Sequence, residues 1–128
     1  MYSKLTSNIM ISVVPVYDVK NSFPSENKYV FTYYITIMNL GDFRVKLLKR
    51  QWHIYDVGYG IYNVHGDGVI GLNPIIDTGA EFTYFSNVTL HSGVGTMQGK
   101  YLFENMETGE TLEAEIPKFE LYSLVLSN

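Results

Sequence analysis

Three glycines spaced as G-x-G-x-x-G form the segment of this sequence that most suggests ligand chemistry. They lie in the segment GDGVIG, residues 66–71. In a dinucleotide-binding fold, this spacing follows a strand and opens a helix whose N-terminus holds the phosphates. Here Pro74 comes soon afterwards, and a proline lacks an N–H and disfavours helix at the residue before it. The sequence therefore predicts that the glycines lie in a loop between strands.

The backbone of this loop could still bind an anion. Glycines let a ligand approach the main chain closely, and successive N–H groups can surround a phosphate. Asp67 opposes this role, because a carboxylate repels phosphate unless a metal ion bridges the two. The chain has no G-x-x-x-x-G-K-[ST] segment, so tight triphosphate binding is not favoured. The alternative is that the glycines supply only turn conformations and close packing.

His65 and Asp67 flank Gly66 and form a His-x-Asp segment. Imidazole and carboxylate both bind divalent transition ions, but two ligands are too few for a tight site. His53 and Asp56 would add to the set only if their strand lies beside this loop. We predict no metal centre and interpret these side chains as polar residues beside a turn.

Arg50 stands two residues before Trp52, so the two side chains are expected on one face of a strand. An arginine directed into a core needs a partner, because an unpaired buried charge is costly. Asp56 has the same parity but lies too far along the strand for a firm pairing. A structural ion pair is the role that we favour for Arg50, with an anion anchor as the alternative. The candidate ligand-binding residues are Arg50, His65, Gly66, Asp67, Gly68 and Gly71.

No set of residues is arranged for catalysis. The chain has no G-x-S-x-G segment, and Ser92 lacks that context. Glu113 and Glu115 alternate with apolar residues, which indicates the solvated face of a strand rather than an acid–base pair. We expect a protein that is not an enzyme and that holds no cofactor.

Hydrophobic patterns of period two predict the strands that position these residues. The predicted strands cover residues 9–17, 29–38, 45–56, 61–65, 82–90, 97–103, 111–116 and 119–126. Trp52, midway along one of them, is expected in the core between two sheets. Pro15 indicates an edge position or the end of strand pairing. The predicted fold is all-β, a fibronectin-III- or immunoglobulin-like antiparallel β-sandwich, with residues 1–128 as a single domain.

The composition argues against several functional classes. Aromatic residues make up 15% of the chain and charged residues 17%, which fits a folded, strand-rich domain. A net charge of −4 disfavours binding to nucleic acid through a basic surface. The absence of cysteine excludes disulfides and thiolate metal sites. No stretch approaches the ~20 apolar residues of a membrane span. We expect a cytoplasmic protein without nucleic-acid or membrane partners.

Aromatic residues occur on both faces of the strand predicted at residues 29–38. Each sheet of a sandwich buries only one face, so the second face indicates an outer apolar surface. If Val30, Tyr34 and Met38 are exposed together, they form a patch suited to a protein partner or a homodimer. Cover by a neighbouring segment is the alternative.

Four ordered blocks of this sequence resemble the bacterial ApaG family. They are YVFTYYITIMN (29–39), RQWHIYD (50–56), GDGVIGLNP (66–74) and GTMQGKY (95–101). They match the family patterns Y-x-F-x-Y-x-I-x-I-x-N, R-x-W-x-I-x-D, G-x-G-V-x-G-x-x-P and G-x-M-x-G-x-Y. The resemblance extends from about Val14 to Phe119.

This resemblance implies a fibronectin-III-like β-sandwich. The family also occurs as a module in some eukaryotic F-box proteins and in a DNA-polymerase-interacting protein, which implies protein–protein contact. It is linked to magnesium and cobalt resistance and to pyrophosphate or nucleotide binding at the glycine loop. We therefore expect a non-enzymatic module that binds another protein or itself. The alternative is pyrophosphate or nucleotide binding at residues 66–71, connected with tolerance of Mg²⁺ or Co²⁺.

Overall fold

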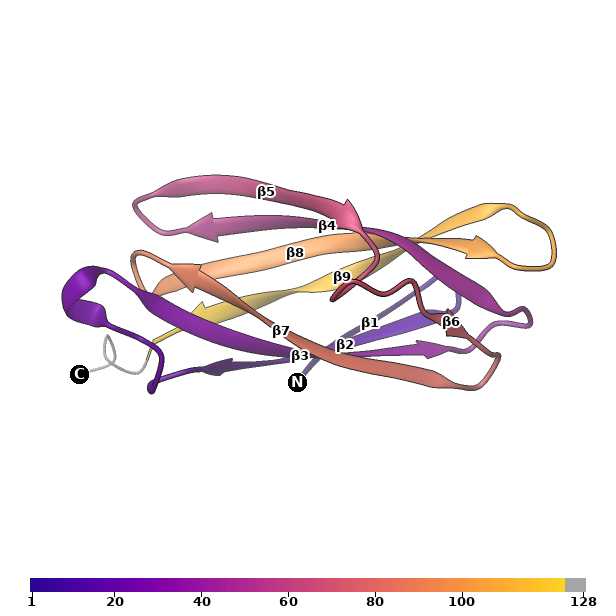
Figure 1. Cartoon of the computed structure of the whole chain (residues 1–128), viewed down its shortest axis with the longest axis horizontal. Helices are drawn as coiled ribbons and strands as arrows, with labels where there is room; N and C mark the ends of the chain where they lie inside the picture. The colour runs from indigo at the N-terminus through magenta and orange to yellow at the C-terminus, as the bar shows by residue number, and fades with distance from the viewer. Residues whose placement is uncertain (124–128) are drawn as a thin grey trace.

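The computed structural model describes residues 1–123 and consists of two antiparallel β-sheets packed face to face (Figure 1). The strands are β1 (Tyr2–Thr6), β2 (Ile9–Tyr17), β3 (Tyr29–Asn39), β4 (Val45–Asp56), β5 (Gly60–Asp67), β6 (Ile75–Ile76), β7 (Glu81–Leu90), β8 (Val94–Asn105) and β9 (Thr111–Tyr122). One sheet has the order β1-β2-β3-β7 and the other β5-β4-β8-β9, with β6 also paired to β4. The predicted antiparallel β-sandwich is confirmed. No helix within residues 1–123 is long and apolar enough to cross a membrane.

The strands differ from the predicted ones at both ends of the chain. The sequence pattern does not predict β1, because most of its side chains are exposed and do not alternate between apolar and polar. The strands predicted at 111–116 and 119–126 form one strand, β9, which passes through Pro117. The pairing of β8 with β9 shifts register beside this proline, between Met97 and Gly99. Such a bulge accommodates a residue that cannot donate to the ladder. The predicted residues 124–126 lie outside the described part of the chain.

Pro15 lies at the end of pairing rather than in an edge strand. β2 is internal to its sheet, between β1 and β3. However, β1 pairs with β2 only as far as Val13, so Pro15 has a strand neighbour on the β3 side alone. The missing N–H of the proline therefore breaks no ladder on the β1 side.

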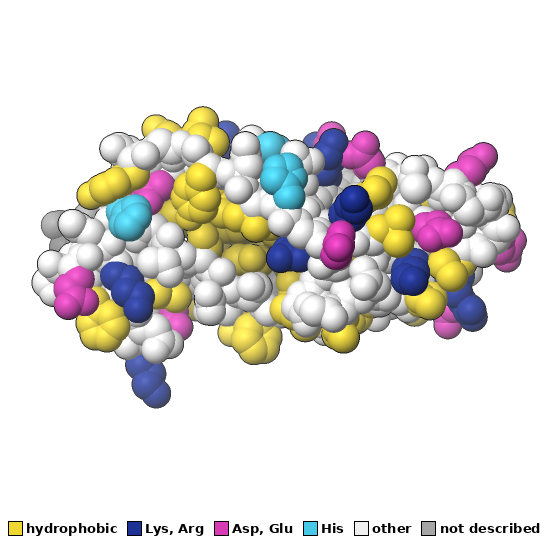
Figure 2. Space-filling view, turned by 45° about the horizontal axis from the view of Figure 1, so that its top comes forward, with side chains coloured by type: hydrophobic (Ala, Val, Ile, Leu, Met, Phe, Trp, Pro, Cys, Tyr) yellow, Lys and Arg dark blue, Asp and Glu magenta, His cyan; other side chains and the backbone are white. Residues whose placement is uncertain are grey.

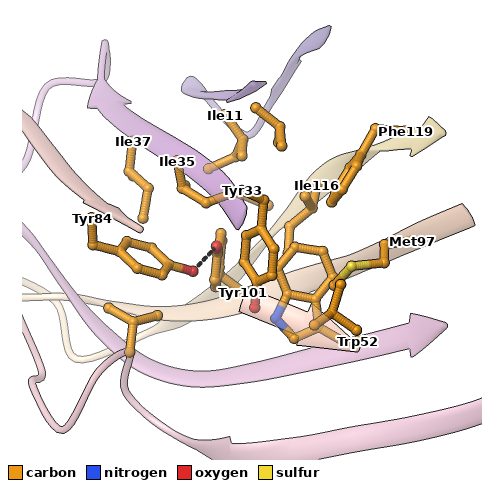
Figure 3. Packing of buried hydrophobic residues seen from close by; sticks show 14 of the residues in the cluster. Ile11, Tyr33, Ile35, Ile37, Trp52, Tyr84, Met97, Tyr101, Ile116 and Phe119 are labelled. Atoms are coloured by element: carbon orange, nitrogen blue, oxygen red, sulfur yellow. Dashed lines mark hydrogen bonds between the residues drawn. The ribbon is translucent and has the colours of Figure 1, made fainter. Parts of the chain in front are cut away.

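Trp52 lies in the core between the sheets, as predicted, with 2% of its surface exposed. Its indole meets the rings of Tyr33, Tyr101 and Phe119 edge to face, at centroid distances of 5.3, 6.5 and 5.9 Å (Figure 3). Edge-to-face pairs are a favourable geometry for aromatic rings. Because Tyr33 belongs to one sheet and Tyr101 to the other, this cluster fixes how the two sheets sit against each other.

The two sides of the sandwich are built differently. On one side β1 reaches β9, where Lys4 pairs with Glu115, Ser7 Oγ donates to Glu113 O and Glu115 N donates to Thr6 Oγ1. On the other side, in residues 1–123, β7 pairs with β3 alone and β5 with β4 alone. The edges of β5 and β7 therefore leave that side of the core without a covering strand.

Candidate functional site

The β4–β5 hairpin carries four of the six candidate residues. Its register places Arg50 opposite Gly66, with His65 and Asp67 at the adjacent positions of β5. Side chains alternate between the two faces of a strand, and Trp52 faces the core. Arg50 therefore points inward, whereas His65 and Asp67 point outward. The structure brings these residues together along the hairpin but divides their side chains between the two faces of the sheet.

The outer face of the β5-β4-β8-β9 sheet contains a pocket of about 470 Å³, and most of the residues that line it are charged or polar. Its lining includes His65, Asp67, Lys49, Lys100 and Glu113. Lys100 forms an ion pair with Glu113 at 2.6 Å, and Lys49 lies opposite Asp67 on the neighbouring strand. Arg50 also borders the pocket, so its lining has three cations and two carboxylates and only a small positive excess to attract an anion.

The guanidinium of Arg50 lies on the inner side, against Gly66. Its Nη1 donates to the carbonyl oxygens of Asp67 and Gly68, both at 3.0 Å. A Cβ at position 66 would stand 2.6 Å from Nη1 and 2.8 Å from Cζ, so the guanidinium occupies the space that glycine leaves. Within residues 1–123 no carboxylate forms a salt bridge with Arg50. The structural ion pair favoured for Arg50 is therefore wrong, because backbone carbonyls hold Arg50 instead.

The segment after β5 closes as a two-residue turn. Val69 N donates to Leu72 O and Leu72 N donates to Val69 O, each at 2.8 Å. Between them, Ile70 and Gly71 have φ of 44° and 76°, the left-handed pair that such a turn requires. Gly71 is thus a turn residue, and Ile70 adopts a conformation that is unusual for a β-branched side chain.

Gly68 is required by close packing of the backbone. Its φ is 61°, and a Cβ there would lie 2.0 Å from Leu72 O. Its N–H donates to Leu48 O at 2.8 Å. The N–H groups of Gly68, Val69 and Leu72 are all bonded within the protein, which supports the turn-and-packing interpretation of the glycines. The prediction that all three glycines lie in a loop is wrong for Gly66, which belongs to β5.

Asp56 is 1% exposed and fixes the connection between β7 and β8. Its carboxylate accepts hydrogen bonds from His91 N at 2.7 Å, Ser92 N at 3.1 Å and Ser92 Oγ at 2.6 Å. The His91 ring instead packs on Tyr59, with 5.0 Å between centroids. A serine, a histidine and an aspartate meet here, but the hydroxyl bonds the carboxylate directly. The imidazole is therefore not placed as the base of a catalytic triad.

The possible metal ligands do not converge. His53 Nδ1 lies 2.6 Å from Asn63 Oδ1, on the outer face, whereas Asp56 is buried on the inner one. Within the described residues, no three His, Cys, Asp or Glu side chains are grouped so as to hold a metal ion. His53 and Asp56 thus do not join His65 and Asp67 in a common site.

Three tyrosine hydroxyls near Arg50 are a feature that the sequence does not reveal. Tyr84 Oη and Tyr101 Oη lie 2.5 Å apart and join the two sheets (Figure 3). Burial raises the pKa of Tyr33, Tyr84 and Tyr101, and the positive charge of Arg50 lowers the pKa of all three to a smaller extent. The strand pattern predicts that each tyrosine side chain faces inward. It does not predict that Tyr84 and Tyr101 contact each other, because this depends on how the two sheets pack.

The outer face of the β1-β2-β3-β7 sheet is a second candidate surface. The register aligns Val14, Tyr34 and Phe85 in one row across three strands, and they are 41%, 48% and 63% exposed. The rings of Tyr34 and Phe85 are in contact, with 5.7 Å between centroids. Val30, Tyr34 and Met38 are not exposed together, because Val30 is 7% exposed and Met38 is half-buried, so the patch that depended on this condition does not form.

Gly66→Ala is expected to destabilise the protein by about 1–3 kcal/mol, because the added Cβ displaces the Arg50 guanidinium from its two carbonyl partners. His65→Ala, at the exposed neighbouring position, is the matched control and should change stability by less than about 0.5 kcal/mol. Urea unfolding measures both. Equal midpoints for wild type and Gly66→Ala would contradict the placement of Arg50.

Alkaline pH is expected to unfold the protein partly through the buried phenols. The pKa of each phenol in the folded state lies above the unfolded value of about 10. The contribution of these neutral phenols to the free energy of unfolding is therefore complete below about pH 10 and is lost as the pH rises above it. Tyr84→Phe removes one of these groups and should make the urea midpoint fall less steeply at alkaline pH. Tyr55→Phe, an exposed control, should follow wild type. An unchanged slope in Tyr84→Phe would refute this assignment.

The comparisons with known proteins agree with this architecture. Residues 19–105 match the model of the ApaG domain. The chain is 40% identical to the ApaG protein of Brucella suis and 42% identical to that of Mesorhizobium japonicum, in each case over 94% of this chain and 92% of the relative. A crystal structure of the ApaA protein of Bordetella pertussis superposes with a TM-score of 0.86 at 34% identity, over 91% of this chain and 94% of that one. The chain therefore belongs to the ApaG domain family.

Proposed function

We propose that this ApaG-family chain is a non-enzymatic module that contacts protein through the outer face of the β1-β2-β3-β7 sheet. The observation that carries the proposal is the exposed row of Val14, Tyr34 and Phe85. Contiguous apolar surface on a folded domain is a mark of an interaction site, and aromatic residues are enriched at the centres of interfaces. The direct bond between Ser92 and Asp56 supports the non-enzymatic part of the proposal.

The turn after β5 extends this apolar surface. Ile70 is 55% exposed and lines, together with Tyr34 and Phe85, an apolar pocket of about 710 Å³. Its left-handed backbone costs roughly 1–3 kcal/mol, a strain that proteins tend to retain at functional positions. An isoleucine at the tip of an exposed turn is consistent with a contact that is completed by another molecule.

The distribution of charge favours a second copy of the chain as the partner. The outward positions of β2, β3 and β7 carry one charged residue, Glu81, at the end of a strand. The outer face of the other sheet carries several, among them Lys49, Asp67, Lys100 and Glu113. Two chains that each have a net charge of −4 repel each other. This repulsion is smallest when the two surfaces in contact carry almost no charged side chains. The uncharged face is therefore the one that fits its own copy.

The double variant Tyr34→Ser/Phe85→Ser is expected to abolish self-association, because it removes the two aromatic rings at the centre of the row. Sedimentation velocity over a range of protein concentrations measures this, with wild type expected to shift toward a dimer. Tyr55→Ser removes a ring of similar exposure from the outer face of the other sheet and should associate as wild type does. A wild type that stays monomeric, or a double variant that still dimerises, would defeat the proposal.

Pyrophosphate or nucleotide binding at residues 66–71 is the second candidate. It is supported by the outer pocket, where Lys49, Lys100 and His65 surround Gly66. A divalent ion held between Asp67 and the phosphates would connect such binding with Mg²⁺ or Co²⁺ tolerance. Calorimetric titration with pyrophosphate or ATP, with and without these ions, should give saturable heat that Lys49→Met weakens. Absence of heat up to millimolar ligand would rule this candidate out.

A further inference from the structure

The open side of the sandwich forms a slot between the edges of β5 and β7. Figure 2 shows a recess with a hydrophobic floor on this side of the molecule, with a basic side chain beside it. At one end, Tyr62 Oη donates to Thr89 O at 3.4 Å and so connects the two edges. At the other end lies the turn that begins at Gly68, whose carbonyl is bound by Arg50. The slot is thus bounded at both ends by contacts within the protein.

On this side of the core, inward-facing side chains of β7 and of its neighbour β3 keep a small part of their surface exposed. Tyr33, Tyr84 and Val88 point inward at this edge of the core and keep 6%, 8% and 8% of their surface exposed. Trp52 and Tyr101, deeper between the sheets, keep 2% and 0%. A flat apolar group entering between β5 and β7 would therefore contact aromatic and aliphatic side chains, which is the usual lining of a small-molecule site.

Arg50 places a positive charge in this slot without a protein counter-ion. Its Nη1 is used by two loop carbonyls, whereas its Nε and Nη2 donate to no atom of residues 1–123. A half-buried charge without an opposite charge is costly, so an anion at this position would be stabilising. The two remaining nitrogens of the guanidinium form a fork that matches a carboxylate or a phosphate.

The tyrosine hydroxyls add a second donor. Tyr84 and Tyr101 have two O–H protons and share one hydrogen bond, so one proton is left to donate. Tyr101 lies directly opposite Arg50 in the register of β4 with β8, so the two inward side chains are neighbours on one face of the sheet. A cation and a hydroxyl donor therefore lie close together at an otherwise apolar recess.

We propose that the slot between β5 and β7 binds a small organic anion, with an aromatic body on the tyrosine floor and a carboxylate or phosphate group on Nε and Nη2 of Arg50. Arg50 and Gly66 also border the outer pocket. The strand alternation nevertheless directs the Arg50 side chain to the opposite face of the sheet from His65 and Asp67. The row of Val14, Tyr34 and Phe85 lies on the outer side of the other sheet, and Tyr84 alone of the slot residues also lines the pocket beside that row.

The test follows the Arg50 Nε–H signal by NMR in isotope-labelled protein during titration with benzoate, phenyl phosphate and neutral benzamide. Both aromatic anions should shift this signal saturably, and the stronger of the two identifies the anionic group; benzamide should not shift it. Arg50→Lys, which keeps a charge but loses the fork, should weaken binding by about tenfold or more. Lys46→Met, on the outer face of the same strand, should bind as wild type does.

Three results would overturn the proposal. The first is an Nε–H signal that does not move at millimolar concentrations of either anion. The second is a shift as strong with inorganic pyrophosphate as with phenyl phosphate, because the aromatic floor would then contribute nothing. The third is binding that Lys49→Met weakens and Arg50→Lys does not, because the anion would then lie in the outer pocket. If Arg50→Lys does not fold, Tyr84→Phe takes its place, and undiminished affinity in that variant would count against the slot.

Discussion

One guanidinium ties the β4–β5 hairpin to the turn that follows it, and the glycine pattern depends on this contact. Arg50 occupies the space beside Gly66 and binds the carbonyls of Asp67 and Gly68. Gly68 is needed because its neighbour across the turn is a backbone oxygen, and Gly71 because the turn requires a left-handed residue. Each of the three glycines is thus required for a different structural reason, and none of these reasons involves a bound phosphate.

The fold follows largely from the strand pattern, and its exceptions have local causes. Trp52 and the alternation along β3 predict the core because burial of one sheet face dominates the choice of residues there. The sequence pattern does not predict β1 because, apart from Tyr2 on the core, its register with β2 and polar contacts with β9 hold it in place. The sequence pattern places a strand end at Pro117, because it does not reveal the bulge that lets β9 continue through this proline.

The candidate site was less accessible from sequence than the fold. Parity places Arg50 on the inner face, and that part of the prediction is confirmed. Its partners could not be predicted, because backbone carbonyls of a turn leave no signature in residue types. The same holds for Tyr84 and Tyr101, which meet only through the packing of the two sheets. The partners of Asp56 could not be predicted either, because its carboxylate binds the connection between β7 and β8, which lies far away in the sequence.

The sandwich divides its surfaces by chemistry. One outer face is charged and polar, the other almost uncharged and aromatic, and one side is closed by β1 and β9 while the other is open between β5 and β7. Membership of the ApaG domain family accounts for the architecture. The proposals for a protein partner and for an organic anion rest on the aromatic face and on the open side, respectively.

Amide hydrogen exchange at Gly68, Val69 and Leu72 is the most direct test of the claim that the glycine segment serves internal packing. The account predicts that these three amides are protected in the protein alone, because each donates to a backbone carbonyl, and that added pyrophosphate leaves their rates unchanged. Rapid exchange in the protein alone, slowed when pyrophosphate is added, would contradict it and would identify the segment as an anion-binding loop.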